Sequence, residues 1–169
     1  PGLVAGGGGL LLAPGASPAA VKPTFTGTDA AASTLSFASD LEITINGTTA
    51  GDGTGSTYSQ LTVVGMIDLN GVELKFSGPY TPAGGDVFLI VDNDGVDAIA
   101  NIFVGLPEGA TISNFRGSGL DATITYVGGD GNDVVLTVLA PCPALTTAPG
   151  EVQVTNSSCI SGCTVTGGS

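Results

Sequence analysis

The stretch "LEITING", residues 41–47, carries the clearest structural signal in this chain. Its apolar residues stand at every second position and polar residues stand between them, which is the period of a β-strand with one buried face. The stretch "VELKFSG", residues 72–78, has the same alternation. Aligning the two sets Leu41 on Val72 and Glu42 on Glu73, an offset of 31 residues. Such an offset is typical of architectures in which successive repeats stack.

Strand signals continue along the chain, whereas helix signals are scarce because the Ala-rich runs are too short to stand as helices. Further strands are expected at 60–64, 66–69, 87–91, 99–104, 110–115 and 133–139, and "ATITYVGG", 122–129, is a candidate third copy of the repeat. The run "VFLIV", 87–91, is apolar throughout and is expected to be buried on both faces. The sequence therefore predicts an all-β domain. Alternation alone does not separate parallel from antiparallel pairing, so an antiparallel β-sandwich stays open beside a stacked solenoid.

Composition divides the chain into three parts. Residues 1–24 form a Gly- and Pro-rich connecting segment, residues 25–139 the β domain, and residues 140–169 a linker with the start of a second module. The three cysteines, Cys142, Cys159 and Cys163, all lie in the last part and are disulfide candidates of an extracellular module. Because three is an odd number, we expect one of them to pair outside this sequence, which reads as a fragment of a longer polypeptide.

The charge balance limits the possible partners. The chain has 15 acidic and 3 basic residues, a net charge of −12. Binding to phosphate backbones depends on clustered Lys and Arg, so no nucleic-acid partner is expected. The apolar run that begins at Leu3 is too short to insert into a membrane. Charged residues make up only 11% of the chain, and a surface with so little charge favours contact with neighbouring repeats or subunits of the same protein.

Two acidic loops are candidates for a calcium site. Gly128–Leu136 fits one copy of a calcium-binding nonapeptide, but one copy supplies only part of the six to eight oxygens that calcium takes. The favoured interpretation is a glycine turn whose polar side chains bind local backbone N–H groups. The loop "DNDGVD", 92–97, resembles the start of an EF-hand but has Phe103 where the glutamate belongs. If the fold joins the loops, the candidate calcium ligands are Asp92, Asp94, Asp97, Asp130 and Asp133.

Catalysis has little support in the sequence. The chain has no His, which excludes Ser-His-Asp and Cys-His arrangements within it. Paired carboxylates suit glycoside hydrolysis, and the pairs available are Asp92 with Asp94 and Glu42 with Glu73, the second stacked by the 31-residue offset. That face reads as solvated and there is no Trp to stack on a sugar. No catalytic residue and no enzyme activity are therefore expected, and an enzyme acting on polysaccharide is the least favoured alternative.

Several phrases together resemble a known family. They are "LAPGASP" (12–18), "LEITINGTTAG" (41–51), "YSQLTVVGMIDLNGVEL" (58–74), "YTPAGGDVFLIVDNDGVDAIANIFVGLPEGA" (80–110) and "ITYVGGDGNDVVLTV" (124–138). In this order they resemble the bacterial autotransporter-associated β-strand repeat proteins of the passenger type, and the Cys-bearing tail resembles a module of large Bacteroidetes adhesins. The chain departs from the family at Pro18-Ala19, where Pro-Gly is more frequent.

The resemblance implies a right-handed parallel β-helix, or the end of a β-solenoid, in an adhesin that is secreted or held on the bacterial cell surface. The expected function is structural and adhesive, as part of a stalk, a filament or an adhesin. The alternative is a calcium-dependent module that binds surface carbohydrate or protein. No cofactor other than this calcium is expected.

Overall fold

The protein is all-β in its computed structural model, which describes residues 24–26, 34–36, 40–64, 66–93 and 96–141. These residues form small strands and one short 3₁₀ turn, η1 (Phe115–Gly117). The strands are β1 (Thr24–Thr26), β2 (Thr34–Ser36), β3 (Leu41–Thr44), β4 (Thr49–Gly51), β5 (Thr57–Ser59), β6 (Leu61–Val64), β7 (Met66–Asp68), β8 (Leu74–Ser77), β9 (Val87–Asn93), β10 (Thr111–Ile112), β11 (Ala122–Gly128) and β12 (Asp133–Val138). No helix in the described part of the chain is long and apolar enough to cross a membrane.

The largest sheet is mixed and has the strand order β1-β6-β9-β12-β11-β10. β1, β6 and β9 are parallel neighbours, whereas β9, β12, β11 and β10 are antiparallel. The remaining strands form three small parallel pairs, β2 with β7, β3 with β8, and β4 with β5. The sheet thus changes from parallel to antiparallel at β9.

The stretches 41–47 and 72–78, which the sequence aligned as repeats, contain strands β3 and β8 that pair in parallel, but the register differs from the alignment. Leu41 pairs with Leu74 and Glu42 with Lys75, so the true offset is 33 positions, two more than the alignment gave. The difference arises because Val72 lies before the strand, where its N–H donates to the carbonyl of Leu69. A shift of two residues keeps the same side chains on the buried face, so β3 and β8 still turn their apolar residues inward.

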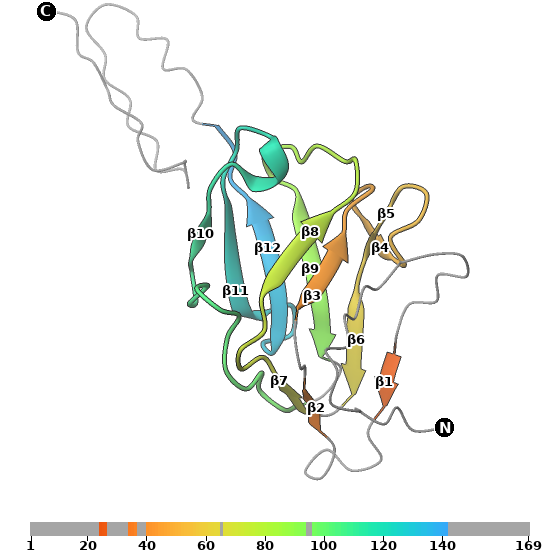
Figure 1. Ribbon diagram of the computed structural model, residues 1–169, viewed down its shortest axis with the longest axis vertical. Helices are drawn as coiled ribbons and strands as arrows, with labels where there is room; N and C mark the ends of the chain where they lie inside the picture. The colour runs from red at the N-terminus through yellow and green to blue at the C-terminus, as the bar shows by residue number, and fades with distance from the viewer. Residues whose placement is uncertain (1–23, 27–33, 37–39, 65, 94–95, 142–169) are drawn as a thin grey trace, which may run out of the picture.

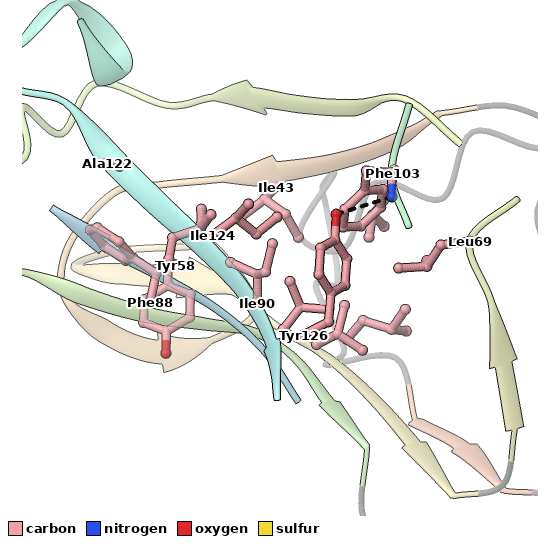
Figure 2. Close-up of a cluster of buried hydrophobic side chains, with 14 of the residues drawn as sticks. Ile43, Tyr58, Leu69, Phe88, Ile90, Phe103, Ala122, Ile124 and Tyr126 are labelled. Carbon is pink, nitrogen blue, oxygen red and sulfur yellow. Dashed lines mark hydrogen bonds between the residues drawn. The ribbon is translucent and has the colours of Figure 1, made fainter. Parts of the chain in front are cut away.

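The β3–β8 pair lies across one face of the large sheet, in front of β9 and β12, and the core fills the space between them (Figure 1). Ile43 of β3, Ile90 of β9 and Ile124 of β11 meet there, and all three are almost completely buried (Figure 2). Phe88 stands edge-on to Tyr58, with ring centroids 5.2 Å apart. Burial of apolar surface stabilises a fold by roughly 25 cal/mol per Å². Because this core contains side chains from both parts of the large sheet, its burial holds the two parts together.

Three expectations about individual strands are wrong. The run 87–91 is not buried on both faces, because Val87 is 52% exposed and Leu89 half-buried while Phe88 and Ile90 point into the core. Residues 122–129 do not repeat β3, because β11 pairs antiparallel with β12. Residues 99–104 form no strand, and only Ala100 makes a parallel bridge, to Asp68. In each case the side-chain pattern was compatible with a strand, but neighbouring elements decided which backbone groups were paired.

Candidate functional site

The stretch Gly128–Leu136 forms the turn of a hairpin, as the favoured interpretation expected. It joins β11 to β12, and the N–H of Gly131 donates to the carbonyl of Gly128 at 2.7 Å. Gly129 and Gly131 have φ angles of 55° and 118°, a backbone region that residues other than glycine rarely adopt. The backbone of the turn thus explains Gly129 and Gly131, whereas a Cβ on Gly128 would clash with the side chain of Val135.

Asp133 begins β12 and is buried beneath this turn, with 3% of its surface exposed. Its Oδ1 accepts a hydrogen bond from the N–H of Asn93 at 2.8 Å, and its Oδ2 accepts one from the N–H of Asp130 at 3.3 Å. A Cβ on Gly129 would come within 1.7 Å of Asp133 Oδ2. Glycine is therefore required at 129 both by the turn and by the carboxylate beside it.

Asp97 joins the loop after β9 to the same hairpin. Its main-chain carbonyl accepts from Asn93 Nδ2 at 2.6 Å and from Asn132 Nδ2 at 3.1 Å. Asn93 is fully buried and Asn132 is 8% exposed. We refer to Asn93, Asp97, Asn132 and Asp133 as the Asx junction. It brings the two predicted acidic loops together, as a shared ion would require.

The five candidate calcium ligands have different positions in this arrangement. Asp97 and Asp133 belong to the Asx junction, whereas Asp92 is half-buried on β9, opposite Thr62 of β6. Asp130 is exposed and contributes its N–H to Asp133, and Asp94 lies outside the described residues. Among the residues that are described, no three His, Cys, Asp or Glu side chains gather closely enough to hold a metal ion by themselves. An ion here would need amide and main-chain oxygens as well as carboxylates.

The sequence indicated Asn132 as a polar residue of the glycine turn, but neither its contact with Asp97 nor the role of Asn93. Asn93 stacks on Val63 of β6 in the parallel register, so it occupies an inward position between apolar neighbours. A polar residue at an inward position of a strand needs hydrogen-bond partners. That signal was present in the sequence, two positions after Val91, but only the charged residues around it attracted attention.

The structure does not place Glu42 and Glu73, one of the carboxylate pairs considered and disfavoured for catalysis, opposite each other. Glu42 lies opposite Lys75 and not opposite Glu73, because of the corrected register. Lys75 Nζ donates to Asp40 Oδ2 and lies 3.5 Å from Glu73 Oε2. The hydrogen bond to Asp40 raises the pKa of Lys75. This face therefore carries an exposed cluster of mixed charge, in which the lysine is held in its charged form. The other proposed pair includes Asp94, which is not described.

The disulfide candidates Cys142, Cys159 and Cys163 lie outside the described residues. The described part of the chain ends just after β12, where the N–H of Leu139 donates to the carbonyl of Asp121. Comparison of the chain with protein-family models, with curated proteins and with solved structures found no match.

Proposed function

We propose that this chain is the end section of a β-solenoid that serves as a structural, adhesive part of a bacterial surface protein. The observation that carries the proposal is the similar spacing of most parallel pairs: apart from β4 and β5, whose partners are 8 positions apart, the paired residues are 30 to 38 positions apart. Thr34 pairs with Met66, 32 positions later, and Leu41 pairs with Leu74, 33 positions later. Leu61 pairs with Val91, 30 positions later. Spacings of 20 to 50 residues are those of stacked repeats.

The pairs also recur in the order that successive coils require. β1, β2 and β3 follow one another along the chain, and β6, β7 and β8 follow in the same order, each parallel to its earlier counterpart. A third passage adds β9 beside β6 and Ala100 beside Asp68. In this interpretation the three strand stacks are the three faces of a solenoid, and the core lies inside them.

The last coil has features that would end such a stack. β12 covers the free edge of β9 with an antiparallel strand, and β11 and β10 continue from it. On the β3–β8 face, the guanidinium of Arg116 donates to the carbonyls of Phe76 and Gly78. Exposed strand edges recruit further strands, so covering them stops growth in this direction. β1 lies at the opposite edge of the large sheet, where β6 is its one strand neighbour among the described residues.

The proposed cellular role rests on the sequence. The family resemblance implies a bacterial surface location, and the low charge content suits contact with neighbouring repeats. The work of such a section is mechanical: stacked strands keep an extended shape through backbone hydrogen bonds and a continuous apolar core. The proposal assigns no catalytic step to the described residues.

Solution NMR tests the proposed stack. Parallel neighbours should give contacts between the backbones of Glu42 and Lys75 and between those of Thr62 and Asp92, because these residues are paired in register. Close Hα–Hα contacts between β3 and β8 would instead indicate antiparallel strands, and with them the sandwich that alternation left open. That result would overturn the solenoid.

The adhesive role needs a separate test in the bacterium that makes the protein. Antibodies against residues 40–141 should label intact cells, and deletion of that segment should reduce attachment to surfaces while the protein is still exported. Labelling only after the cells are permeabilised would contradict the surface location. Normal attachment after the deletion would contradict the adhesive role.

A further inference from the structure

The Asx junction contains buried oxygen atoms that accept no hydrogen bond. Asn93 Oδ1 and Asp97 Oδ2 are both inaccessible to solvent and have no hydrogen-bond partner. Asn93 itself is fully buried. Leaving a buried acceptor without a donor costs about 1–3 kcal/mol, and more for a charged group. Two such atoms at one junction call for an explanation such as a bound ion or water.

A hydrogen bond joins the two residues that carry these oxygens. Asn93 reaches Asp97 with its amide nitrogen, which donates to the Asp97 carbonyl at 2.6 Å. Its amide oxygen therefore lies beside Asp97, whose own carboxylate carries the second oxygen without a donor. The Asp133 carboxylate is fixed next to them, because its Oδ1 accepts from the N–H of Asn93.

Among the described residues, no basic side chain is paired with the Asx junction. Lys75 is paired with Asp40 and Glu73 on the β3–β8 face. Arg116 donates to the end of β8. The chain's third basic residue, Lys22, lies outside the described part. The junction thus combines two carboxylates with amide and main-chain oxygens, and no cationic side chain in the described part of the chain is paired with them.

We propose that the Asx junction binds a calcium ion through Asn93, Asp97 and Asp133. Calcium accepts carboxylate, amide, main-chain and water oxygens in flexible geometry, which matches a junction that lacks three clustered carboxylates. With so few charged ligands, the dissociation constant should lie in the range of about 10⁻⁴–10⁻³ M found in extracellular modules. Magnesium should bind less well, because it requires near-ideal octahedral geometry and gives up its waters reluctantly. The inference does not depend on the solenoid or on the surface role.

Calorimetric titration of the metal-freed full chain with CaCl₂, with MgCl₂ as comparison, tests the proposal directly. One calcium per chain is expected in the stated range. Thermal unfolding should agree, because calcium at ten times its dissociation constant multiplies the ratio of folded to unfolded protein by about 11. If calcium up to about 10 mM neither binds nor raises the melting temperature, the proposal is overturned, and a buried water, which can donate to both oxygens, serves them instead.

Two variants show whether the binding belongs to this junction. Asp97→Asn keeps the shape of the side chain and removes the charge, and should weaken calcium binding at least tenfold. In the absence of calcium, Asp97→Asn should not lower the melting temperature, because no ion then compensates the buried carboxylate that the variant removes. Asp130→Asn is the matched control, since Asp130 is exposed in the same turn, and it should change the affinity less than about twofold. Equal weakening by both variants would mean diffuse attraction to acidic loops and would overturn the site.

Discussion

The parallel and antiparallel halves of the large sheet are made of strands that look alike in sequence, and they differ in how the strands are connected. β11 and β12 are separated only by residues 129–132, whereas β6 and β9 are separated by a long excursion that includes β7 and β8. A short turn can only join antiparallel neighbours, while parallel neighbours need a long crossover. The length of the connection, more than the strand pattern, therefore sets the direction of each pair.

The two halves also complete their hydrogen bonds differently. β6 begins at Leu61, opposite Val91, so Leu89 lies beyond the start of the paired segment. Side chains replace the missing strand there: Leu89 N–H donates to the Tyr58 hydroxyl at 3.1 Å, and Gln60 Nε2 donates to the Leu89 carbonyl at 2.9 Å. Burial raises the pKa of Tyr58. The parallel half thus depends on polar side chains at Leu89, while in the antiparallel half β11 and β12 pair through their backbones and side chains complete single positions, such as Glu108 Oε2, which accepts from the N–H of Tyr126 at 2.7 Å.

The largest effect is expected where the halves share one core. Phe88 is fully buried on β9, edge-on to Tyr58 and tilted against Phe115 at 6.1 Å. Replacing Phe88 with Ala should lower the free energy of unfolding by about 3–5 kcal/mol, measured by urea denaturation. Val127→Ala is the control, because Val127 is 67% exposed and its loss should change stability by less than about 0.5 kcal/mol. One transition should persist in the Phe88 variant. Two separate transitions would mean that the halves fold independently.

A smaller effect is expected from the side chains that extend the parallel ladder. Gln60→Ala removes the donor to the Leu89 carbonyl and should cost about 1–3 kcal/mol, because a buried acceptor is left unserved. Tyr58→Phe should act in the same way on the Leu89 N–H. The control is Tyr80→Phe, whose hydroxyl donates to Asp86 Oδ2 in a more open place. If Tyr80→Phe lowers the free energy of unfolding as much as Tyr58→Phe does, the prediction that the parallel half depends specially on these side chains is wrong.

Arg116 gives a third effect, which concerns the edge of β8. Arg116→Met removes the donors to the Phe76 and Gly78 carbonyls and should cost about 1–2 kcal/mol. The uncovered edge should also let chains associate, so sedimentation velocity should show larger species as concentration rises. Lys75→Met removes one positive charge from the same sheet and should leave both properties nearly unchanged, since exposed ion pairs contribute little. A monomeric Arg116 variant would show that the arginine does not protect the edge.

The sequence predicted those parts of the fold that local pattern determines. β6, β7, β9 and β12 were found because each alternates between the core and solvent or is bounded by turn residues. The register of β3 and β8 was missed because an alignment counts Val72 as a strand residue, although its buried side chain belongs to the turn before β8. The prediction of a strand at residues 99–104 was wrong for a different reason. Asn101 has a φ of 60°, and a left-handed residue interrupts a strand whatever its neighbours are.

The charged residues of the candidate site could be predicted from the sequence, whereas the contacts of its amide side chains could not. Asp97 and Asp133 stood out as acidic residues near glycine turns, and the structure brings their loops together. Asn93 and Asn132 carry no charge, and their importance depends on being buried across from Asp97, 35 positions from Asn132. Such a contact follows from tertiary packing, which the order of residues within each loop does not reveal.

The smallest effect is expected at Asp68, which connects two passages of the parallel half. Its Oδ1 accepts from Asn101 Nδ2 at 2.8 Å and from Asn70 N–H at 2.9 Å. The hydrogen bond from Asn101, followed by that from Asn70, lowers the pKa of Asp68. A lowered pKa means that the folded state holds its proton less tightly than the unfolded state. The resulting stability is present above the ordinary pKa near 4 and is lost as the pH falls through the lowered value.

Asp68→Asn should therefore flatten the fall of the melting temperature below about pH 4, measured by circular dichroism. Asn101→Ala should flatten it as well, because it removes the largest cause of the lowered pKa while leaving the carboxylate in place. The effect should stay small, since Asp68 lies near solvent, where hydrogen bonds to water replace those that are lost. If the Asn101→Ala variant keeps the wild-type dependence of the melting temperature on pH, the hydrogen bond from Asn101 does not measurably lower the pKa of Asp68. The contact between Asn101 and Asp68 of β7 would then contribute geometry and no measurable stability.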